Sequence, residues 1–454
     1  MLSLSGCPGR KGVFMHRRIV KELFSFIAAC PSVFHVTDQM KRMLDGKGYE
    51  QLLEGSSWNL HEGGRYYVIR NGSALIAFQI PKKKFVGFQI MASHGDSPCF
   101  KIKEQPEMEA EQMYVKLNVE KYGGAILSPW FDRPLSVAGR LIVREDDGLA
   151  VKLVSVDRDL VMIPSLAIHM NRKTNEGNAY NLQKDLLPLY GGADAKGTFL
   201  RQVSEAAGVR EEAILGKDLF LYDRGKGSVW GAEQEFISIG KLDDLQCVFA
   251  SLKAFLLAEP GESIPVHCVF DNEEVGSGTK QGAASTFLYD TLNRINEGMG
   301  RTAQEYRQAV ASSFMVSADN AHAVHPNYPE KACPTNRPVL NGGIVIKYSA
   351  NQKYTTDGVA AALFQEICDH AGVPCQTFCN RSDIPGGSTL GNLSGMQVAV
   401  NCVDIGLPQL SMHSPYETAG IRDTWYLVQA AKAFFECSVA ESGYGRIALR
   451  FEGI

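Results

Sequence analysis

The chain has 454 residues, of which 45% are hydrophobic and 21% are charged, so it can bury a large core and is long enough for two or three domains. Its net charge of -4 comes from 46 basic and 50 acidic residues mixed along the sequence, a pattern that excludes nucleic acid as an expected partner. No apolar stretch approaches the roughly 20 residues of a membrane span, and scattered cysteines without a CxxC pair predict reduced thiols in the cytoplasm.

The N-terminal part is predicted to be helical after a short extension. Residues ahead of Met15 are expected to be unstructured, whereas the residues from about Ile19 to Leu53 are compatible with helix. An amphipathic helix is predicted before Gly46 and Gly48. Its apolar positions are Phe34, Val36, Met40, Met43 and Leu44.

Three strands are predicted next. The sequence RYYVIRNGSALIAFQIP predicts two strands joined by a turn at Asn71-Gly72, and KKKFVGFQIMASH predicts a third strand. We expect these strands to form a small β-meander that leads into His94.

The pattern changes between about Phe100 and Glu235. Apolar and polar residues alternate in MYVKLNVE, GRLIVRE and LAVKLVSV, a polar loop spans residues 171–183, and few long helical patterns occur. We therefore predict an inserted, mainly β domain over residues 101–235. The flanking residues 1–100 and 236–454 would together form the other domain.

From Phe236 onward, helical patterns such as DLQCVFASLKAFLLAE alternate with the short buried strands PVHCVF, SFMVSA and VAVNCVDIG. This alternation predicts an α/β layer structure with a largely parallel central sheet. Ligands of such sheets gather at the carboxyl ends of the strands, so the residues that follow strands are the candidates for a site.

Side chains that can bind metal ions stand at the edges of several apolar segments. They comprise two histidines and three carboxylates, which suit two zinc ions bridged by one shared carboxylate. The candidates are His94, Asp243, Glu274, Asp319 and His413. Taken singly, His94 is more often a core or surface residue, and Asp243 could cap a helix. The joint pattern predicts a metal centre.

Two further acids stand beside these candidates. Asp96 can accept the proton on the second ring nitrogen of His94 and so fix its tautomer, or it can be a turn residue before Pro98. If Glu274 coordinates a metal ion, its neighbour Glu273 can take a proton from the attacking water and pass it to the leaving amine. The alternative for this pair is a solvated acidic loop tip.

Nine segments carry a resemblance to a known family. They are YYVIRNGSALIAF, MASHGDSPCFKIK, PSLAIHMNR, KLDDL, DNEEVGS, SADNAHAVHPNYPEK, IVIKYSANQKY, SDIPGGSTLG and PQLSMHSPYE. In this order, over nearly the whole chain, they resemble the aspartyl aminopeptidase family of dinuclear zinc metallopeptidases.

The resemblance implies a zinc-peptidase-like three-layer α/β domain with a β-rich dimerisation domain inserted after the first metal histidine. It also implies that dimers assemble into a dodecamer. The implied metal ligands are Asp243 as the bridge, His94 and Asp319 on one ion, and Glu274 and His413 on the other. Glu273 would be the general base, and His169 would reach into the neighbouring subunit's active site to help hold the oxyanion.

The resemblance also points to a substrate pocket. Lys347 and Tyr354 occupy family positions associated with that pocket, and a lysine ammonium would suit an N-terminal aspartate or glutamate. Lys347 could equally be an exposed strand residue. Two departures from the family are Asp244, where many members carry asparagine, and Gly386, where some carry cysteine. They raise questions about the local charge and about the pocket wall, respectively.

These features predict a cytoplasmic metalloaminopeptidase that removes an N-terminal residue, expected to be acidic, from short peptides. Zinc is the expected ion at both sites, with cobalt or manganese as alternatives. A dinuclear aminopeptidase of neutral or broad specificity is one rival hypothesis, and a non-catalytic oligomeric scaffold is another. His322 and His325 are expected to order the loop after Asp319 without binding metal.

Overall fold

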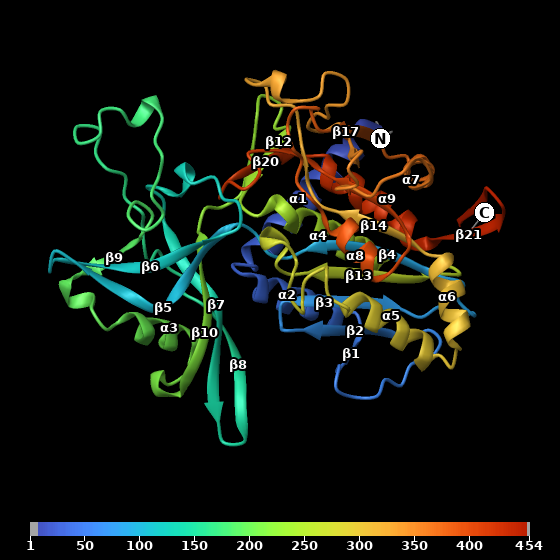
Figure 1. The fold of residues 1–454 in the computed structure, drawn as a ribbon, viewed down its shortest axis with the longest axis horizontal. Coiled ribbons are helices and arrows are strands. Elements are labelled where there is room, and N and C mark those ends of the chain that lie inside the picture. The colour runs from blue at the N-terminus through green and yellow to red at the C-terminus, as the bar shows by residue number, and fades with distance from the viewer. Residues whose placement is uncertain (1–7, 452–454) are drawn as a thin grey trace, which may run out of the picture.

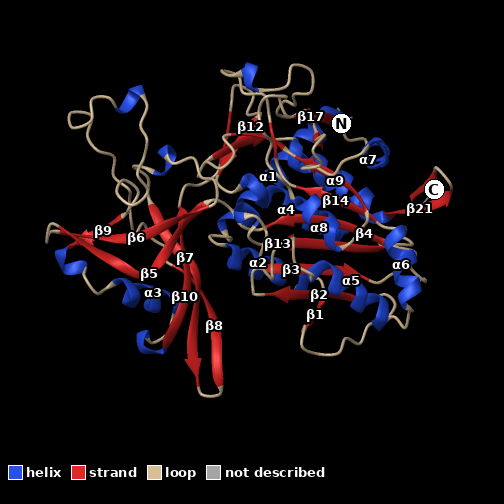
Figure 2. Cartoon of the chain, in the orientation of Figure 1, coloured by secondary structure: helices blue, strands red, loops and turns tan. Residues whose placement is uncertain are grey.

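The computed structural model describes residues 8–451, which form a larger lobe around a central sheet and a smaller, mostly β lobe beside it (Figures 1 and 2). Helix α1 (Pro8–Ala28) begins before Met15. The expected unstructured extension is therefore wrong for residues 8–14, because the helix that packs into the core continues backward through them, and residues 1–7 lie outside the described residues. Within that described part, no helix is long and apolar enough to cross a membrane.

The central sheet has nine strands and mixed directions. In spatial order they are β1 (Glu50–Leu52), β2 (Arg65–Arg70), β3 (Ala74–Gln79), β13 (Ile264–Phe270), β4 (Phe88–His94), β14 (Phe314–Ala318), β18 (Asn401–Gly406), β16 (Ile344–Tyr348) and β17 (Cys375–Cys379). The four strands β13, β4, β14 and β18 run parallel. The predicted mixed, largely parallel sheet is confirmed.

Strand β13 separates two strands that the sequence suggested were neighbours. The hairpin of β2 and β3 is present, with Asn71 and Gly72 at positive φ in its turn. Strand β4, however, pairs with β13, and β13 pairs with β3 on its other side. The predicted meander is wrong, because the fully buried strand β13, which comes from a distant part of the chain, lies between β3 and β4 and pairs with both.

Helices cover both faces of this sheet, and the strands divide their side chains between the two faces. One core contains residues of α1, α2 (Val33–Asp45), α4 (Leu242–Leu257), α7 (Gly358–Ala371) and α9 (Asp423–Glu436). The other contains residues of α5 (Phe287–Gly298), α6 (Ala303–Ala311) and α8 (Leu390–Gln397). In β14, Val316 belongs to the first core and Met315 to the second, so the sheet is the middle of three layers.

The smaller lobe is built on a six-stranded antiparallel sheet. Its spatial order is β8 (Gly148–Ser155), β7 (Leu135–Glu145), β10 (Ile214–Asp223), β5 (Cys99–Ala110), β6 (Tyr114–Tyr122) and β9 (Leu189–Gly192). Helix α3 (Phe199–Ala207) packs beside it, and residues such as Phe100 and Trp130 belong to a core of its own. The domain bounds 101–235 stay a prediction, because β11 (Ser228–Trp230) pairs with β12 outside this sheet.

A small third sheet joins distant segments beside the central sheet. Its spatial order is β11, β12 (Phe236–Ile239), β20 (Glu417–Gly420), β19 (Pro408–Leu410) and β15 (Ala321–His322). Strand β12 leads directly toward α4, and the turn between β19 and β20 contains His413. The described part of the chain finishes with the hairpin of β21 (Cys437–Gly443) and β22 (Arg446–Phe451).

Candidate metal centre

Three of the predicted site segments meet at the carboxyl edge of the central sheet. His94 is the last residue of β4 and is in register with Phe270, the last residue of β13. Glu273 and Glu274 follow β13 in the short helix Glu273–Val275, and Asp319 directly follows β14. Since these strands are parallel neighbours, their ends bring the side chains together.

The other two predicted ligands reach this edge from outside the central sheet. Asp243 stands at the start of α4 with non-helical angles, φ -82 and ψ 108, after Lys241 with φ 63. His413 lies in the turn between β19 and β20 and has φ 69. Positive φ in residues other than glycine is strained and is held by surrounding structure, often at functional sites.

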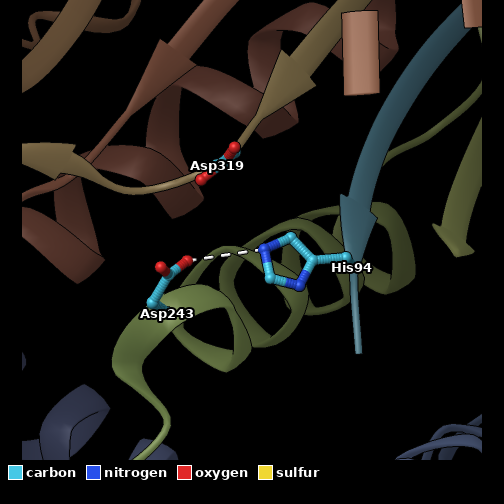
Figure 3. Close-up of side chains that lie close together, drawn as sticks. All are labelled: His94, Asp243 and Asp319. Atoms are coloured by element: carbon cyan, nitrogen blue, oxygen red, sulfur yellow. Dashed lines mark ion pairs between the residues drawn. The ribbon is translucent and has the colours of Figure 1, made fainter. Parts of the chain in front are cut away.

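The five predicted ligands form two overlapping clusters. His94, Asp243 and Asp319 offer ligand atoms within 4.8 Å of one another, and so do Asp243, Glu274 and His413. His94 Nε2 is 3.4 Å from Asp243 Oδ1, and His413 Nε2 is 3.4 Å from Asp243 Oδ2. Figure 3 shows His94 and Asp319 facing the carboxylate of Asp243. Asp243 is therefore common to both clusters.

The spacing of these atoms fits metal ions. Two atoms bound to one tetrahedral zinc at about 2.1 Å lie about 3.4 Å apart, and His413 Nε2 is also 3.4 Å from Glu274 Oε2. The buried atoms Asp243 Oδ1 and Glu274 Oε1 have no hydrogen-bond partner among the described residues. A cation between the side chains would satisfy these oxygens. Glu273 lies beside the clusters, within 4.8 Å of His94 and Glu274.

Burial and mutual repulsion shift the ionisation of these groups. Burial raises the pKa of Glu274 to about 11, and the charge of Asp243 adds to this rise. Burial also raises the pKa of Glu273 to about 7, which suits a general base near neutral pH. Burial disfavours a charged His94, yet its contacts with Asp243 and Asp96 raise its pKa above the ordinary value.

Asp96 organises the site more broadly than the sequence suggested. His94 Nδ1 lies 3.1 Å from the Asp96 carbonyl oxygen and 3.4 Å from its Oδ1, so the contact with the second ring nitrogen is present. The Asp96 carboxylate also accepts the backbone N–H groups of Glu273 and Glu274, each at 3.2 Å. It thus holds a histidine and the adjacent glutamate turn together.

Glu417 is a site residue that sequence reasoning missed. Its buried carboxylate accepts the backbone N–H of Asp243 at 3.0 Å and that of His413 at 2.8 Å. It therefore fixes the backbone of two predicted ligands at once. The available signal was an acid four residues after His413, within the quoted segment PQLSMHSPYE.

The predicted pocket residues lie beside the clusters. Lys347 is buried, which excludes the exposed strand position considered above. Its Nζ donates to the Asp319 carbonyl oxygen at 2.7 Å and lies 3.8 Å from Asp319 Oδ2. Burial disfavours the ammonium, but Asp319 raises the pKa of Lys347 to about 12. Tyr354 is buried too, with its ring centroid 5.2 Å from Lys347 Nζ.

His169 is not part of these clusters within one chain. It is exposed in the long segment between β8 and β9, which extends away from the larger lobe in Figure 1. This segment carries exposed apolar side chains, among them Leu166 (60% exposed) and Met170 (77% exposed).

The remaining sequence observations concern neighbours of the site. Among the described residues, neither His322 nor His325 belongs to a group that could hold a metal ion. Asp244 is fully buried, and burial raises its pKa well above the ordinary value. At Gly386 an added Cβ would lie 2.2 Å from Asn380 Nδ2, so a larger side chain would require the Asn380 side chain to shift.

Comparison with known proteins agrees with this geometry. Residues 26–435 match the family described as Aminopeptidase I zinc metalloprotease (M18). The chain belongs to the M18 family. This M18 protein is a zinc metalloaminopeptidase, a hydrolase of peptide bonds.

Relatives of this M18 chain cover almost its whole length. It is 46% identical over 425 residues to a probable M18 family aminopeptidase 2 of Clostridium acetobutylicum, covering 91% of this chain and 98% of that protein. It is 40% identical over 433 residues to one of Pseudomonas aeruginosa, covering 93% and 99%.

Solved structures share the fold of this M18 chain. A complex of Ape4 and Nbr1 matches with a TM-score of 0.90 and 35% identity, over 93% of this chain and 86% of that chain. The S. cerevisiae mApe1 dodecamer matches with a TM-score of 0.81 and 29% identity, over 92% and 96%. The predicted α/β fold is therefore confirmed.

The raised pKa values predict how zinc affects stability. In the metal-free M18 protein, the pKa values of Glu273 and Glu274 are higher than in the unfolded chain. Their contribution to folding is thus present at low pH and is lost as the pH rises above about 4.5 toward the folded values. Between about pH 6 and pH 8, the melting temperature of the metal-free protein should fall more than that of the zinc-loaded protein, because zinc binds the ionised carboxylates.

Scanning calorimetry with chelator or with zinc at both pH values measures this difference. Glu274→Gln removes one titrating carboxyl and should flatten the pH dependence of the metal-free protein. Equal pH dependence with and without zinc would contradict the prediction.

Proposed function

We propose that this M18 enzyme uses two divalent ions to remove an N-terminal aspartate or glutamate from short peptides. The observation that carries the proposal is that the two oxygens of Asp243 face two different histidines, each at 3.4 Å. His94 and Asp319 would hold one ion, and Glu274 and His413 the other. Zinc is the expected ion, and cobalt or manganese also accepts such ligands.

The residues around the two ions have separate tasks in hydrolysis. The ions would supply Lewis acidity and a nucleophilic water at neutral pH. Glu273 accepts the proton of the attacking water and then donates it to the leaving amine, for which a pKa near neutrality is suited. Its backbone N–H is fixed by Asp96, so the carboxylate starts from a defined position.

An acidic preference is supported by Lys347. Its ammonium is buried beside a predicted metal ligand and stays charged, since Asp319 raises its pKa to about 12. In a desolvated pocket a fixed cation favours an anionic side chain and disfavours a cationic one. The ring of Tyr354 lies next to the same ammonium and would form part of the pocket wall.

An assembly of subunits is supported by the exposed segment between β8 and β9. Its apolar side chains, including Leu166, Ile168 and Met170, would be buried by a second copy of the chain. Residues 101–235 would form the dimerisation domain, and His169 would enter the partner's site to stabilise the oxyanion. A solved neighbour, mApe1, is a dodecamer, and we extend that assembly to this chain.

The free thiols support a location in the cytoplasm. The ten cysteines of the described residues are all free, as expected in a reducing environment.

Substituting each adjacent glutamate separates the two proposed roles. Glu273→Gln should retain both ions and lose about 10²- to 10⁴-fold in kcat, because the proton acceptor is removed. Glu274→Gln should lose metal content, because an ion loses a ligand. Metal analysis and turnover of an aspartyl peptide measure both variants, and Glu436→Gln on α9 is the control. Full turnover by Glu273→Gln would remove this residue from the mechanism.

The proposed acidic preference can be tested by the ratio of kcat/KM for two substrates of one enzyme preparation, which does not depend on the metal content of that preparation. In Lys347→Met, the ratio of kcat/KM for aspartyl over leucyl substrates should fall about 10- to 100-fold. A panel of aspartyl, glutamyl, leucyl and lysyl amides measures it, with Lys432→Met as the control. Equal activity of the wild type across this panel would instead support a broad specificity.

The proposed action of His169 across the subunit interface predicts complementation. His169→Ala and Glu273→Gln should each be inactive alone. When they are co-expressed, about a quarter of the wild-type activity should return, because about half of random dimers are mixed and each mixed dimer holds one complete site. No recovery in mixed oligomers that retain zinc would place the action of His169 elsewhere.

A further inference from the structure

One strand of the inserted sheet ends at the metal centre of its own chain. Tyr122 is the last residue of β6, and its hydroxyl donates to Asp96 Oδ2 at 2.7 Å. The same hydroxyl accepts a hydrogen bond from Asn272 Nδ2 at 2.9 Å. Asp96 in turn holds the backbone of Glu273 and Glu274. One hydroxyl of the inserted sheet is therefore fixed to the carboxylate that arranges the glutamate turn.

The two glycines after Tyr122 approach the second cluster. An added Cβ at Gly123 would lie 3.0 Å from Glu274 Cβ, and one at Gly124 would lie 3.2 Å from His413 Nδ1. The Gly124 carbonyl oxygen lies 3.2 Å from His413 Nδ1, and Ile126 N–H donates to the His413 carbonyl oxygen at 3.0 Å. Residues 122–126, named here the β6 extension, thus contact groups that orient ligands of both predicted ions.

The ring of Tyr122 is fixed in the inserted sheet. It packs edge-on against Phe220 of β10, with ring centroids 5.8 Å apart. Phe220 also contacts Phe34 of α2, with 6.5 Å between the ring centroids. The guanidinium of Arg140 lies 4.2 Å from the centroid of the Phe34 ring. Because Tyr122 is held by packing on one side and by hydrogen bonds on the other, a shift of the sheet displaces its hydroxyl relative to Asp96.

We propose that Tyr122 is a positioning residue through which the inserted sheet sets the geometry of the metal centre in its own chain. The inference rests on the proposed two-ion site and extends it, because the domain expected to form the dimer also completes the support of the ligands. Outer hydrogen bonds of this kind orient the ligands of a metal ion and raise its affinity. Binding of zinc and docking of the β6 extension then stabilise each other, as linkage requires.

The variant Tyr122→Phe tests the hydroxyl while keeping the ring. It should weaken zinc binding about 10- to 100-fold, measured by competition with a chromogenic chelator on the full-length protein. At saturating zinc, kcat should fall while KM changes little, because the ligands rather than the substrate pocket are displaced. Tyr190→Phe is the matched control, since Tyr190 lies in β9 of the same sheet and its hydroxyl bonds Thr198 at 2.8 Å. A zinc affinity within about twofold of wild type for Tyr122→Phe would overturn the proposal.

Hydrogen exchange of the wild-type protein provides a second test that does not depend on a variant. Removing zinc should speed exchange at Ile126, whose N–H bonds His413, while the hairpin of β7 and β8 keeps its rate. Unchanged exchange in the β6 extension would also overturn the proposal. The zinc-affinity and hydrogen-exchange measurements are made without peptide, so a wrong assignment of substrate preference would leave their outcome unaffected.

Discussion

The concentration of negative charge at one edge of the central sheet is the constraint on which the site depends. Asp243 and Asp319 are buried, and Glu273 and Glu274 lie next to them with their pKa values raised by burial. Carboxylates held this close cannot all ionise without cations, and the nearby imidazoles with Lys347 supply only part of the charge. Divalent ions between the side chains would resolve this conflict, because they would neutralise carboxylates that otherwise repel one another.

This arrangement is held in place because hydrogen bonds join the segments that carry the predicted ligands. Glu417 fixes Asp243 and His413, and it accepts a hydrogen bond from Gln409 Nε2 at 3.3 Å. Gln409 Oε1 accepts from Asn320 Nδ2 at 2.8 Å, and Asn320 directly follows Asp319. A buried chain of polar groups therefore joins three segments that carry predicted ligands. Satisfied networks of this kind define one geometry, because any displacement would leave a buried group without its partner.

The sequence was informative where local chemistry determines the outcome. His94 and Asp319 could be found because they end apolar strands, and Asn71-Gly72 because few residues suit that turn. The family resemblance was needed to choose a bridging role for Asp243 over that of a helix cap. The placement of β13 between β3 and β4 could not be predicted, since strand partners are chosen by packing across the whole domain. The contacts of Tyr122 with Asp96 and of Glu417 with Asp243 escaped for the same reason: the partners are remote in the chain.

Lys347 shows how closely two properties of the enzyme are joined. Its ammonium is the neighbour of Asp319 and also the group proposed to select acidic substrates. A chain that evolved toward neutral substrates by losing this charge would also lose the counterion of Asp319, a proposed metal ligand. A change of substrate preference would then require a compensating change at the ion site. Substrate preference and ion binding would therefore have to evolve together.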